Sequence, residues 1–190
     1  MRIILASSSK SRKKLMKKIF KGFSCVKPKI NEKLSKPYHA CAKRLAEKKA
    51  ENVARKVANS VTIGSDTIIV CNGKVIRKTG SEKIARASLK FISGKKCTAH
   101  TGVCVVCRKG GQTVRGVSFV SSASFLVRKL SDAQILWYIK TGEPFYKGGC
   151  IAVEGKGKKF VRKIIGESAC IQGLPVKRLK KEIAKFRSFL

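Results

Sequence analysis

Residues 61–70, Val-Thr-Ile-Gly-Ser-Asp-Thr-Ile-Ile-Val, form a nearly continuous apolar run with the length of a buried strand. Asp66 lies inside this run. An ionised carboxylate in an apolar strand costs roughly several kcal/mol unless a cation or a dense set of hydrogen-bond donors compensates it. The run therefore requires a sheet and a local partner for Asp66, which makes Asp66 the first candidate for a chemical role. The purely structural alternative is an aspartate held by backbone amides at a strand bend.

Predicted strands and helices alternate along the rest of the chain. The pattern predicts strands at 3–6, 23–30, 97–108, 113–128 and 160–165, and helices at 12–20, 37–59, 81–92, 131–140 and after residue 175. Asn72-Gly73 predicts a type I′ hairpin. We therefore expect an α/β fold, with a mixed central sheet flanked by helices, in one compact unit.

The chain is strongly basic, with 44 lysines and arginines against 10 acids and a formal charge of +34. The basic residues are scattered rather than gathered in a block, so we expect a charged surface on a folded protein. Such a surface attracts polyanions non-specifically. Nucleic-acid binding is less favoured because few aromatic residues are interleaved with the lysines and arginines. Trp137 and Phe125 have the spacing of core residues.

The eight cysteines do not have the spacing of a zinc site. Cys104 and Cys107 are the one Cys-x-x-Cys pair, and three-residue spacing in a strand directs side chains to opposite faces. We expect small buried thiols in a reducing compartment. The N-terminal apolar stretch is too short for a signal peptide and no 18-residue apolar run exists, so a cytoplasmic protein without a membrane span is expected.

A serine-rich loop, Ser7-Ser-Ser9, separates the first predicted strand from the first predicted helix. In such a loop, backbone N–H groups and the helix dipole can meet an anion, most naturally a phosphate. Arg12 adds a fork of donors that suits phosphate oxygens. The loop is a candidate phosphate site, although a serine-rich capping loop has the same appearance.

Short motifs along nearly the whole chain resemble, in order, those of the Maf family of nucleoside triphosphate pyrophosphatases. The opening Ile4-Leu-Ala-Ser-Ser-Ser-x-x-Arg12 resembles the family's L-A-S-x-S-P-R-R. Further motifs match in register: Arg44-Leu-Ala-x-x-Lys49-Ala, Gly64-Ser-Asp66-Thr, Leu89 to Gly94 with Thr101-Gly102, Leu130-Ser-Asp with Tyr138 and Gly142-Glu-Pro144, and Gly173-Leu-Pro175. Each motif is short, but their shared order makes the resemblance specific.

The resemblance implies a fold similar to Maf and inosine triphosphate pyrophosphatases, with two lobes around a deep cleft, in a single domain over residues 1–190. It implies a house-cleaning enzyme, usually a homodimer, that hydrolyses the α–β phosphoanhydride of nucleoside triphosphates to monophosphate and pyrophosphate with Mg²⁺ or Mn²⁺. The residues it marks are Asp66, Lys49 and Lys78 for catalysis, Glu32 and Asp66 for the metal, Ser7, Ser9 and Arg12 for the phosphates, and Ser11, Thr67 and Glu154 for the base.

Several positions depart from the family pattern. Lys29-Ile-Asn-Glu32 replaces an acidic D-x-D-E stretch, so weaker metal binding and a slow enzyme are expected alternatives. Thr67 matches the dTTP/UTP branch, Glu154 matches the 7-methyl-GTP branch, and Ser11 matches neither. Residues 160–166 resemble the pyrimidine branch, which favours dTTP/UTP. The alternatives are a 7-methyl-GTP pyrophosphatase and a basic nucleic-acid-binding protein on a degraded enzyme fold.

Overall fold

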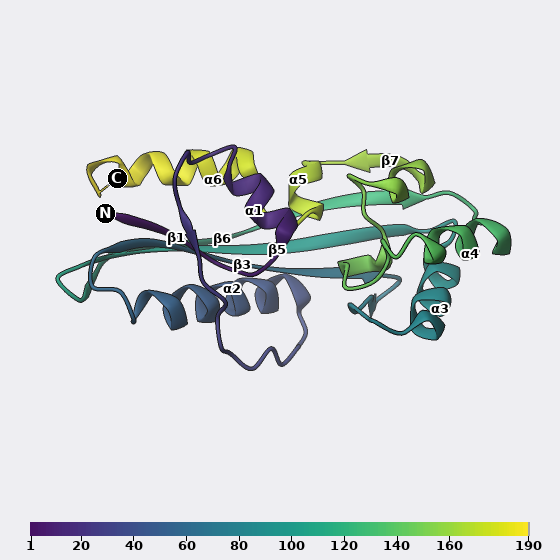
Figure 1. Ribbon diagram of the computed structural model, residues 1–190, viewed down its shortest axis with the longest axis horizontal. Coiled ribbons are helices and arrows are strands. Elements are labelled where there is room, and N and C mark those ends of the chain that lie inside the picture. Colours follow the sequence, from purple (N-terminus) through teal and green to yellow (C-terminus); the bar gives the residue numbers. More distant parts are fainter. Residues whose placement is uncertain (190) are drawn as a thin grey trace. The chain divides into compact units, whose positions relative to one another are not determined.

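The structure, a computed structural model that describes residues 1–189, contains a mixed β-sheet with helices on its faces (Figure 1). The strand order is β2-β1-β3-β5-β6-β7, and β4 pairs with β3. The strands are β1 (Arg2–Ala6), β2 (Ser24–Cys25), β3 (Ser60–Cys71), β4 (Lys74–Val75), β5 (Lys96–Lys109), β6 (Gln112–Val127) and β7 (Val161–Ile165). The α-helices are α1 (Lys10–Met16), α2 (Tyr38–Ala54), α3 (Glu82–Ile92), α4 (Asp132–Lys140), α5 (Ser168–Ile171) and α6 (Val176–Ile183).

Parallel and antiparallel pairings coexist in this sheet, as the sequence predicts. Strand β1 runs parallel to both β2 and β3, whereas β4 and β7 pair antiparallel with β3 and β6. The β3–β4 hairpin turns at Asn72 and Gly73, which both have positive φ, as a type I′ turn requires. Ser81 and Ser131 cap α3 and α4, and Gln134 completes the predicted capping box.

Three predicted boundaries are wrong. The strand expected over 23–30 is reduced to Ser24–Cys25, since Pro28 has no N–H to donate to a ladder. Helix α1 begins and ends earlier than predicted, at Lys10 and Met16. The helix expected to reach residue 59 ends at Ala54, because the chain must turn before Ser60, the first β3 residue paired with β1. The short helix α5 was not predicted.

The chain divides into two compact units, which we call unit 1 and unit 2 and describe separately. Unit 1 comprises Met1–Thr67, Thr101–Ser121 and Gly173–Leu190, and unit 2 comprises Ile68–His100 and Ser122–Gln172. Strands β3, β5 and β6 contribute residues to both units.

In unit 1, α2 covers one face of the strands, and α1 and α6 lie on the other face (Figure 1). Gly64 and Gly102 bring two strands against the α2 backbone. A Cβ at Gly64 would overlap the carbonyl of Ala46, and a Cβ at Gly102 would overlap the carbonyl of Ala42. These glycines let α2 lie closer to the sheet than any side chain would permit.

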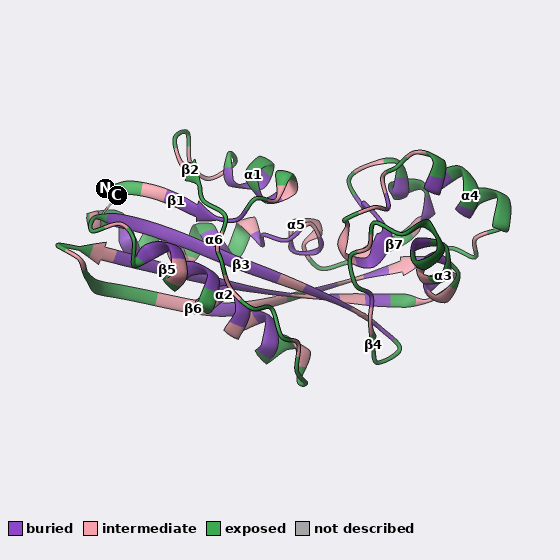
Figure 2. Cartoon of the chain, turned by 60° about the horizontal axis from the view of Figure 1, so that its bottom comes forward, coloured by how far each residue is buried: buried purple, intermediate pink, exposed green. Residues whose placement is uncertain are grey.

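Unit 2 has an extended apolar core, and residues of α3, α4 and the strands are buried in it (Figure 2). Phe125, Leu89, Ile135 and Tyr138 are all fully buried there. Trp137, expected in the core, is instead 41% exposed and lies under the ammonium of Lys159. Helix α4 directs Tyr138 inward, and its neighbour Trp137 therefore turns toward the surface.

Glu143 closes the glycine-rich loop of unit 2. Its carboxylate accepts backbone hydrogen bonds from Lys156 (2.9 Å) and Gly157 (2.8 Å). The hydroxyl of Tyr138 accepts from the N–H of Ala152 at 2.9 Å and contacts the same carboxylate. Burial opposes ionisation of Glu143, but the backbone donors outweigh it and hold its pKa below the usual value.

All eight cysteines are free, and seven of them are buried, as expected for thiols that fill the core. Burial, with help from the negative charges of Glu47 and Glu51, raises the pKa of Cys104 to about 12. Such a thiol is unreactive at neutral pH. In the part of the chain that the structure describes, no helix has the length and apolarity to cross a membrane.

We predict that Gly102→Ala destabilises the protein by about 2–3 kcal/mol, because the new methyl group must push the α2 backbone away from β5. Chemical denaturation measures this change. Gly116→Ala is the control, since its Cβ would meet only the carbonyl of Val105 at 3.7 Å. Equal stability of the two variants would refute the close approach.

We also predict a pH-dependent role for Glu143. Because the folded pKa is lowered, the ionised carboxylate stabilises the fold above the unfolded value of about 4.3, and this stability is lost as pH falls through the folded pKa. Glu143→Gln should therefore lower the unfolding free energy by about 1–2 kcal/mol at pH 7, and by less toward pH ~3. Urea denaturation across this range, with exposed Glu82→Gln as the control, checks both statements; a pH-independent difference would contradict them.

Candidate functional site

The candidate site lies where β1 ends beside β3 in unit 1. The parallel pairing stops at Ala6 opposite Gly64, and the chain turns away at Ser7. Residues 65–67 of β3 therefore continue past the end of β1. In open sheets with parallel strands, ligands bind at the carboxyl ends of the strands. This edge is thus where fold geometry favours a ligand.

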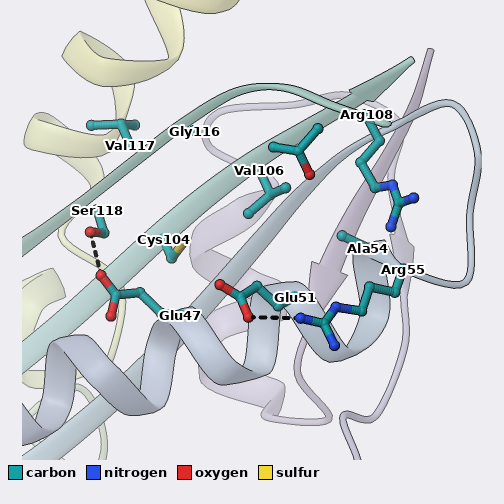
Figure 3. A pocket seen from close by; sticks show the side chains of 11 residues that line it. Glu47, Glu51, Ala54, Arg55, Cys104, Val106, Arg108, Gly116, Val117 and Ser118 are labelled. Atoms are coloured by element: carbon teal, nitrogen blue, oxygen red, sulfur yellow. Dashed lines mark hydrogen bonds and ion pairs between the residues drawn. The ribbon is translucent and has the colours of Figure 1, made fainter. Parts of the chain in front are cut away.

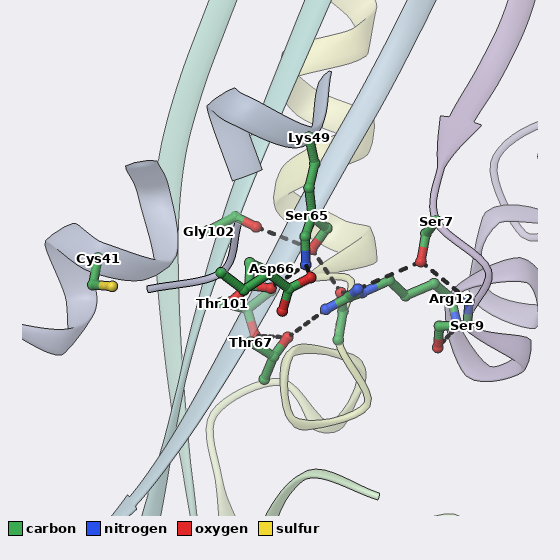
Figure 4. A network of polar contacts seen from close by, with 12 residues as sticks. Ser7, Ser9, Arg12, Cys41, Lys49, Ser65, Asp66, Thr67, Thr101 and Gly102 are labelled. Carbon is green, nitrogen blue, oxygen red and sulfur yellow. Dashed lines mark hydrogen bonds and ion pairs between the residues drawn. The ribbon is translucent and has the colours of Figure 1, made fainter. Parts of the chain in front are cut away.

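Asp66 is buried there, and its partner is the ammonium group of Lys49 (Figure 4). Nζ of Lys49 lies 2.5 Å from Oδ1 of Asp66, and the two side chains are 7% and 9% exposed. Lys49 belongs to the buried stripe of α2 that includes Leu45, Ala46 and Val53. The cation that the buried carboxylate requires is therefore supplied by the chain itself.

Glu32 brings a second carboxylate to the same lysine. Its Oε1 lies 2.8 Å from Nζ of Lys49, although its side chain is 57% exposed. The two predicted metal acids, Asp66 and Glu32, thus meet at one ammonium group. Of these two acids, Asp66 is buried and Glu32 faces solvent.

Arg12 is the second buried cation of the site. Its Nε donates to the carbonyl of Gly173 at 2.9 Å, and its terminal nitrogens donate to Ser7 (3.4 Å) and Thr67 (3.2 Å). Burial lowers the pKa of Arg12 from its usual value, while the charges of Asp66 and Glu32 oppose this shift. The guanidinium points toward the Asp66 carboxylate (Figure 4), so two cations flank that acid.

The predicted serines lie around Arg12. The side chain of Ser9 caps α1 by accepting from the N–H of Arg12 (3.4 Å), and the N–H of Ser9 donates to Ser7 Oγ (3.2 Å). Ser11 lies on the first turn of α1 and is half-buried. These contacts orient Arg12; phosphate binding by the serines stays a prediction.

Sequence reasoning missed three parts of this cluster: Ser65, Thr101 and the carbonyl of Gly173. Oγ of Ser65 lies 2.8 Å from that carbonyl and 3.0 Å from the carbonyl of Gly102. Thr101 shares a 3.0 Å hydrogen bond with Thr67. Gly173 has φ +109° and its α-carbon faces Arg12, which explains a glycine there. A buried hydroxyl in an apolar strand was the available signal for Ser65.

The segment carrying Glu32 is fastened to one face of α2. The N–H of Lys29 donates to Asn52 Oδ1 at 2.9 Å. Closer to the start of the helix, Arg44 Nη2 donates to the carbonyl of Lys33 (3.1 Å) and to Ser35 Oγ (3.0 Å). Side chains spaced along a single helix therefore position a stretch that has no strand or helix of its own.

Two predicted residues, Lys78 and Glu154, belong to unit 2. Lys78 is exposed in the stretch that follows β4. Glu154 lies before the 3-10 turn at Lys156–Phe160, with its Oε1 3.4 Å from Nζ of Lys147. Their roles stay predictions.

A divalent metal would have two carboxylates at this site. The described residues, 1–189, contain no group of three or more His, Cys, Asp or Glu that could hold a metal ion. Mg²⁺ usually takes one or two protein carboxylates and completes its shell with water and substrate phosphates. Asp66 and Glu32 therefore fit a metal that is shared with a phosphate ligand, and do not fit a metal held by protein alone.

A pocket of about 420 Å³ lies elsewhere in unit 1, between the outer side of α2 and the strands β5 and β6 (Figure 3). Glu47 and Glu51 supply negative charge to its wall, and Ser118 donates to Glu47 at 2.6 Å. None of the predicted catalytic, metal-binding or substrate-binding residues lines this pocket. The cluster around Asp66 brings predicted site residues together at the end of β1 and is therefore the candidate site.

The chain is similar in sequence to known proteins over nearly its whole length. A family model described as Maf-like protein matches residues 2–186. A dTTP/UTP pyrophosphatase of Carboxydothermus hydrogenoformans is 37% identical over 98% of this chain and 99% of its own length. A dTTP/UTP pyrophosphatase of Caldicellulosiruptor saccharolyticus is 36% identical over 97% and 94%.

Among solved structures, the Staphylococcus aureus Ham1 protein matches 97% of this chain and 99% of its own, with a TM-score of 0.55 and 12% identity. At that identity the likeness concerns the fold alone, and it agrees with the mixed sheet flanked by helices.

We predict that Arg44→Leu loosens residues 29–36 without unfolding the protein. Loss of the hydrogen bonds to Lys33 and Ser35 should lower the free energy of local opening by about 1–2 kcal/mol. Amide exchange in that segment should then be roughly 5- to 30-fold faster. Hydrogen-exchange mass spectrometry measures this rate. Arg55→Leu on the same helix, with an exposed 3.7 Å pair to Glu51, is the control and should leave the segment unchanged.

Proposed function

The chain belongs to the Maf-like protein family, and from this premise we propose that it is a nucleoside triphosphate pyrophosphatase. The reaction cleaves the α–β phosphoanhydride to give a nucleoside monophosphate and pyrophosphate. The observation that carries the proposal is the buried cluster in which Lys49 and Arg12 flank Asp66 at the end of β1. Two cations beside a carboxylate suit a polyphosphate and an attacking water molecule.

Asp66 is the proposed general base. Oδ1 accepts from Lys49, which leaves Oδ2 to take a proton from water. The water oxygen forms a bond to the α-phosphorus as the bond from that phosphorus to the bridging oxygen breaks. The bridging oxygen leaves with pyrophosphate, and the proton on Asp66 passes to solvent. Lys49 and Arg12 stabilise negative charge on the phosphates, and Lys78 is proposed to do the same.

Asp66 and Glu32 are the residues that would hold Mg²⁺ or Mn²⁺. When bound, such an ion supplies positive charge to the phosphates and lowers the pKa of a bound water molecule. Ser7 and Ser9 are proposed to support the phosphate end through Arg12, to which both are hydrogen-bonded.

For the base, we propose dTTP or UTP, the nucleotides in the names of the two relatives. Thr67 and Ser11 in unit 1 and Glu154 in unit 2 are the proposed selecting positions. The pair between Glu154 and Lys147 supports this choice, because a neutralised carboxylate has less attraction for a cationic base. A 7-methyl-GTP pyrophosphatase is the alternative within the same reaction.

A function of another class, polyanion binding on a degraded enzyme fold, is favoured by the formal charge of +34. We propose that this charge gives weak, salt-sensitive attraction to nucleic acids in addition to catalysis. We further propose one pyrophosphatase domain over residues 1–190, a homodimer, and action in the cytoplasm, where nucleoside triphosphates are held.

The test is pyrophosphate release with Mn²⁺ from a full nucleotide panel. We expect dTTP and UTP to be the best substrates, and Asp66→Asn to slow the reaction about 100-fold or more, since it removes the base. Asp132→Asn, which alters an exposed acid paired with Lys90 at 2.8 Å, is the control. Preference for 7-methyl-GTP would select the alternative substrate. If the wild type releases no pyrophosphate and binds duplex DNA at high salt, the enzyme proposal is wrong and a nucleic-acid-binding function takes its place.

A further inference from the structure

Lys49 occupies the position between the two carboxylates that are the candidate metal ligands. Its ammonium nitrogen lies 2.5 Å from Oδ1 of Asp66 and 2.8 Å from Oε1 of Glu32. Lys49 is on the buried side of α2, so its ammonium group is held in place by packing and is not a mobile surface charge. One ammonium group of this chain thus already pairs with both acids.

An ammonium group and a divalent ion compete for carboxylate oxygens. Both are compact cations, and two positive charges a few ångströms apart repel strongly where the dielectric constant is low. Arg12 adds a further buried positive charge close to Asp66. A metal that approaches the site without its substrate therefore meets paired acids and two cations.

We propose that Lys49 is a built-in counter-ion that weakens divalent-metal binding to the free enzyme, so that the metal binds together with the nucleotide. This inference rests on the proposed function. A triphosphate carries several negative charges, which offer Lys49 and Arg12 new partners and release Asp66 and Glu32 for the metal. By linkage, nucleotide and metal then tighten each other's binding by the same factor.

The first test compares two adjacent lysines of α2. Lys49→Met and Lys48→Met remove the same charge, but Lys48 is exposed. Electron paramagnetic resonance titration with Mn²⁺, without nucleotide, measures metal affinity. We expect Lys49→Met to bind Mn²⁺ roughly tenfold or more tightly than the wild type, because a repelling charge is gone, and Lys48→Met to match the wild type. Equal affinities of the Lys49→Met variant and the wild type would overturn the proposal.

A second test uses the wild type, in case Lys49→Met does not fold. Mn²⁺ binding is measured with and without an α,β-imido analogue of dTTP, with correction for Mn²⁺ bound by the analogue alone. We expect the free protein to remain unsaturated at Mn²⁺ concentrations that saturate the complex. Saturation of the free protein at the same concentrations would reject the counter-ion role.

These outcomes are separate from those for the proposed function. Metal and analogue binding are measured without turnover, so an active wild type with unchanged Mn²⁺ affinity in Lys49→Met would remove only the counter-ion role. A wild type that releases no pyrophosphate from any triphosphate would remove the proposed function itself.

Discussion

The contact between Lys49 and Asp66 is the interaction on which the candidate site in unit 1 depends. A carboxylate and an ammonium group lose most of their hydration at this depth, and only short, direct pairing offsets that loss. The pairing is possible because α2 lies against β3 and β5 at Gly64 and Gly102, where a Cβ would overlap the helix backbone. Two glycines and one helix stripe therefore determine where the acid and its cation meet.

The charge distribution of the chain supports this arrangement. The chain has 10 acidic residues against 44 basic ones, and two of these 10 acids meet at Lys49. The remaining positive charge produces a field that attracts anionic ligands and raises their rate of encounter.

Much of the architecture could be predicted from local patterns. The Asn72-Gly73 turn, the serine caps and the long β5–β6 pair follow from residue types at fixed spacing. Asp66 could be singled out because a charge in an apolar strand requires a partner. Lys49 could not be placed by composition, since any lysine of such a basic chain reads as a surface charge. The resemblance of Arg44-Leu-Ala-x-x-Lys49-Ala to the family motif singled it out, and its burial on the α2 stripe became known only from the structure.

Other parts of the site depend on contacts between segments far apart in sequence. Ser65 and Arg12 both bond to the carbonyl of Gly173, more than 100 residues away in each case, and no local pattern encodes that meeting.

The period of β3 explains why the cluster has two kinds of partner. Successive side chains of a strand point to opposite faces, so Asp66 faces α2 while Ser65 and Thr67 face the segments that carry Arg12 and Gly173. Where β1 is paired with β3, the continuous sheet separates the side chains on these two faces. Because β1 ends opposite Gly64, the next residues of β3 lie at an edge where the guanidinium of Arg12 and the carboxylate of Asp66 approach each other. In the same register, a β1 strand two residues longer would place Ser8 beside Asp66 and cover that edge, so the early turn at Ser7 is as necessary to the site as its charged groups.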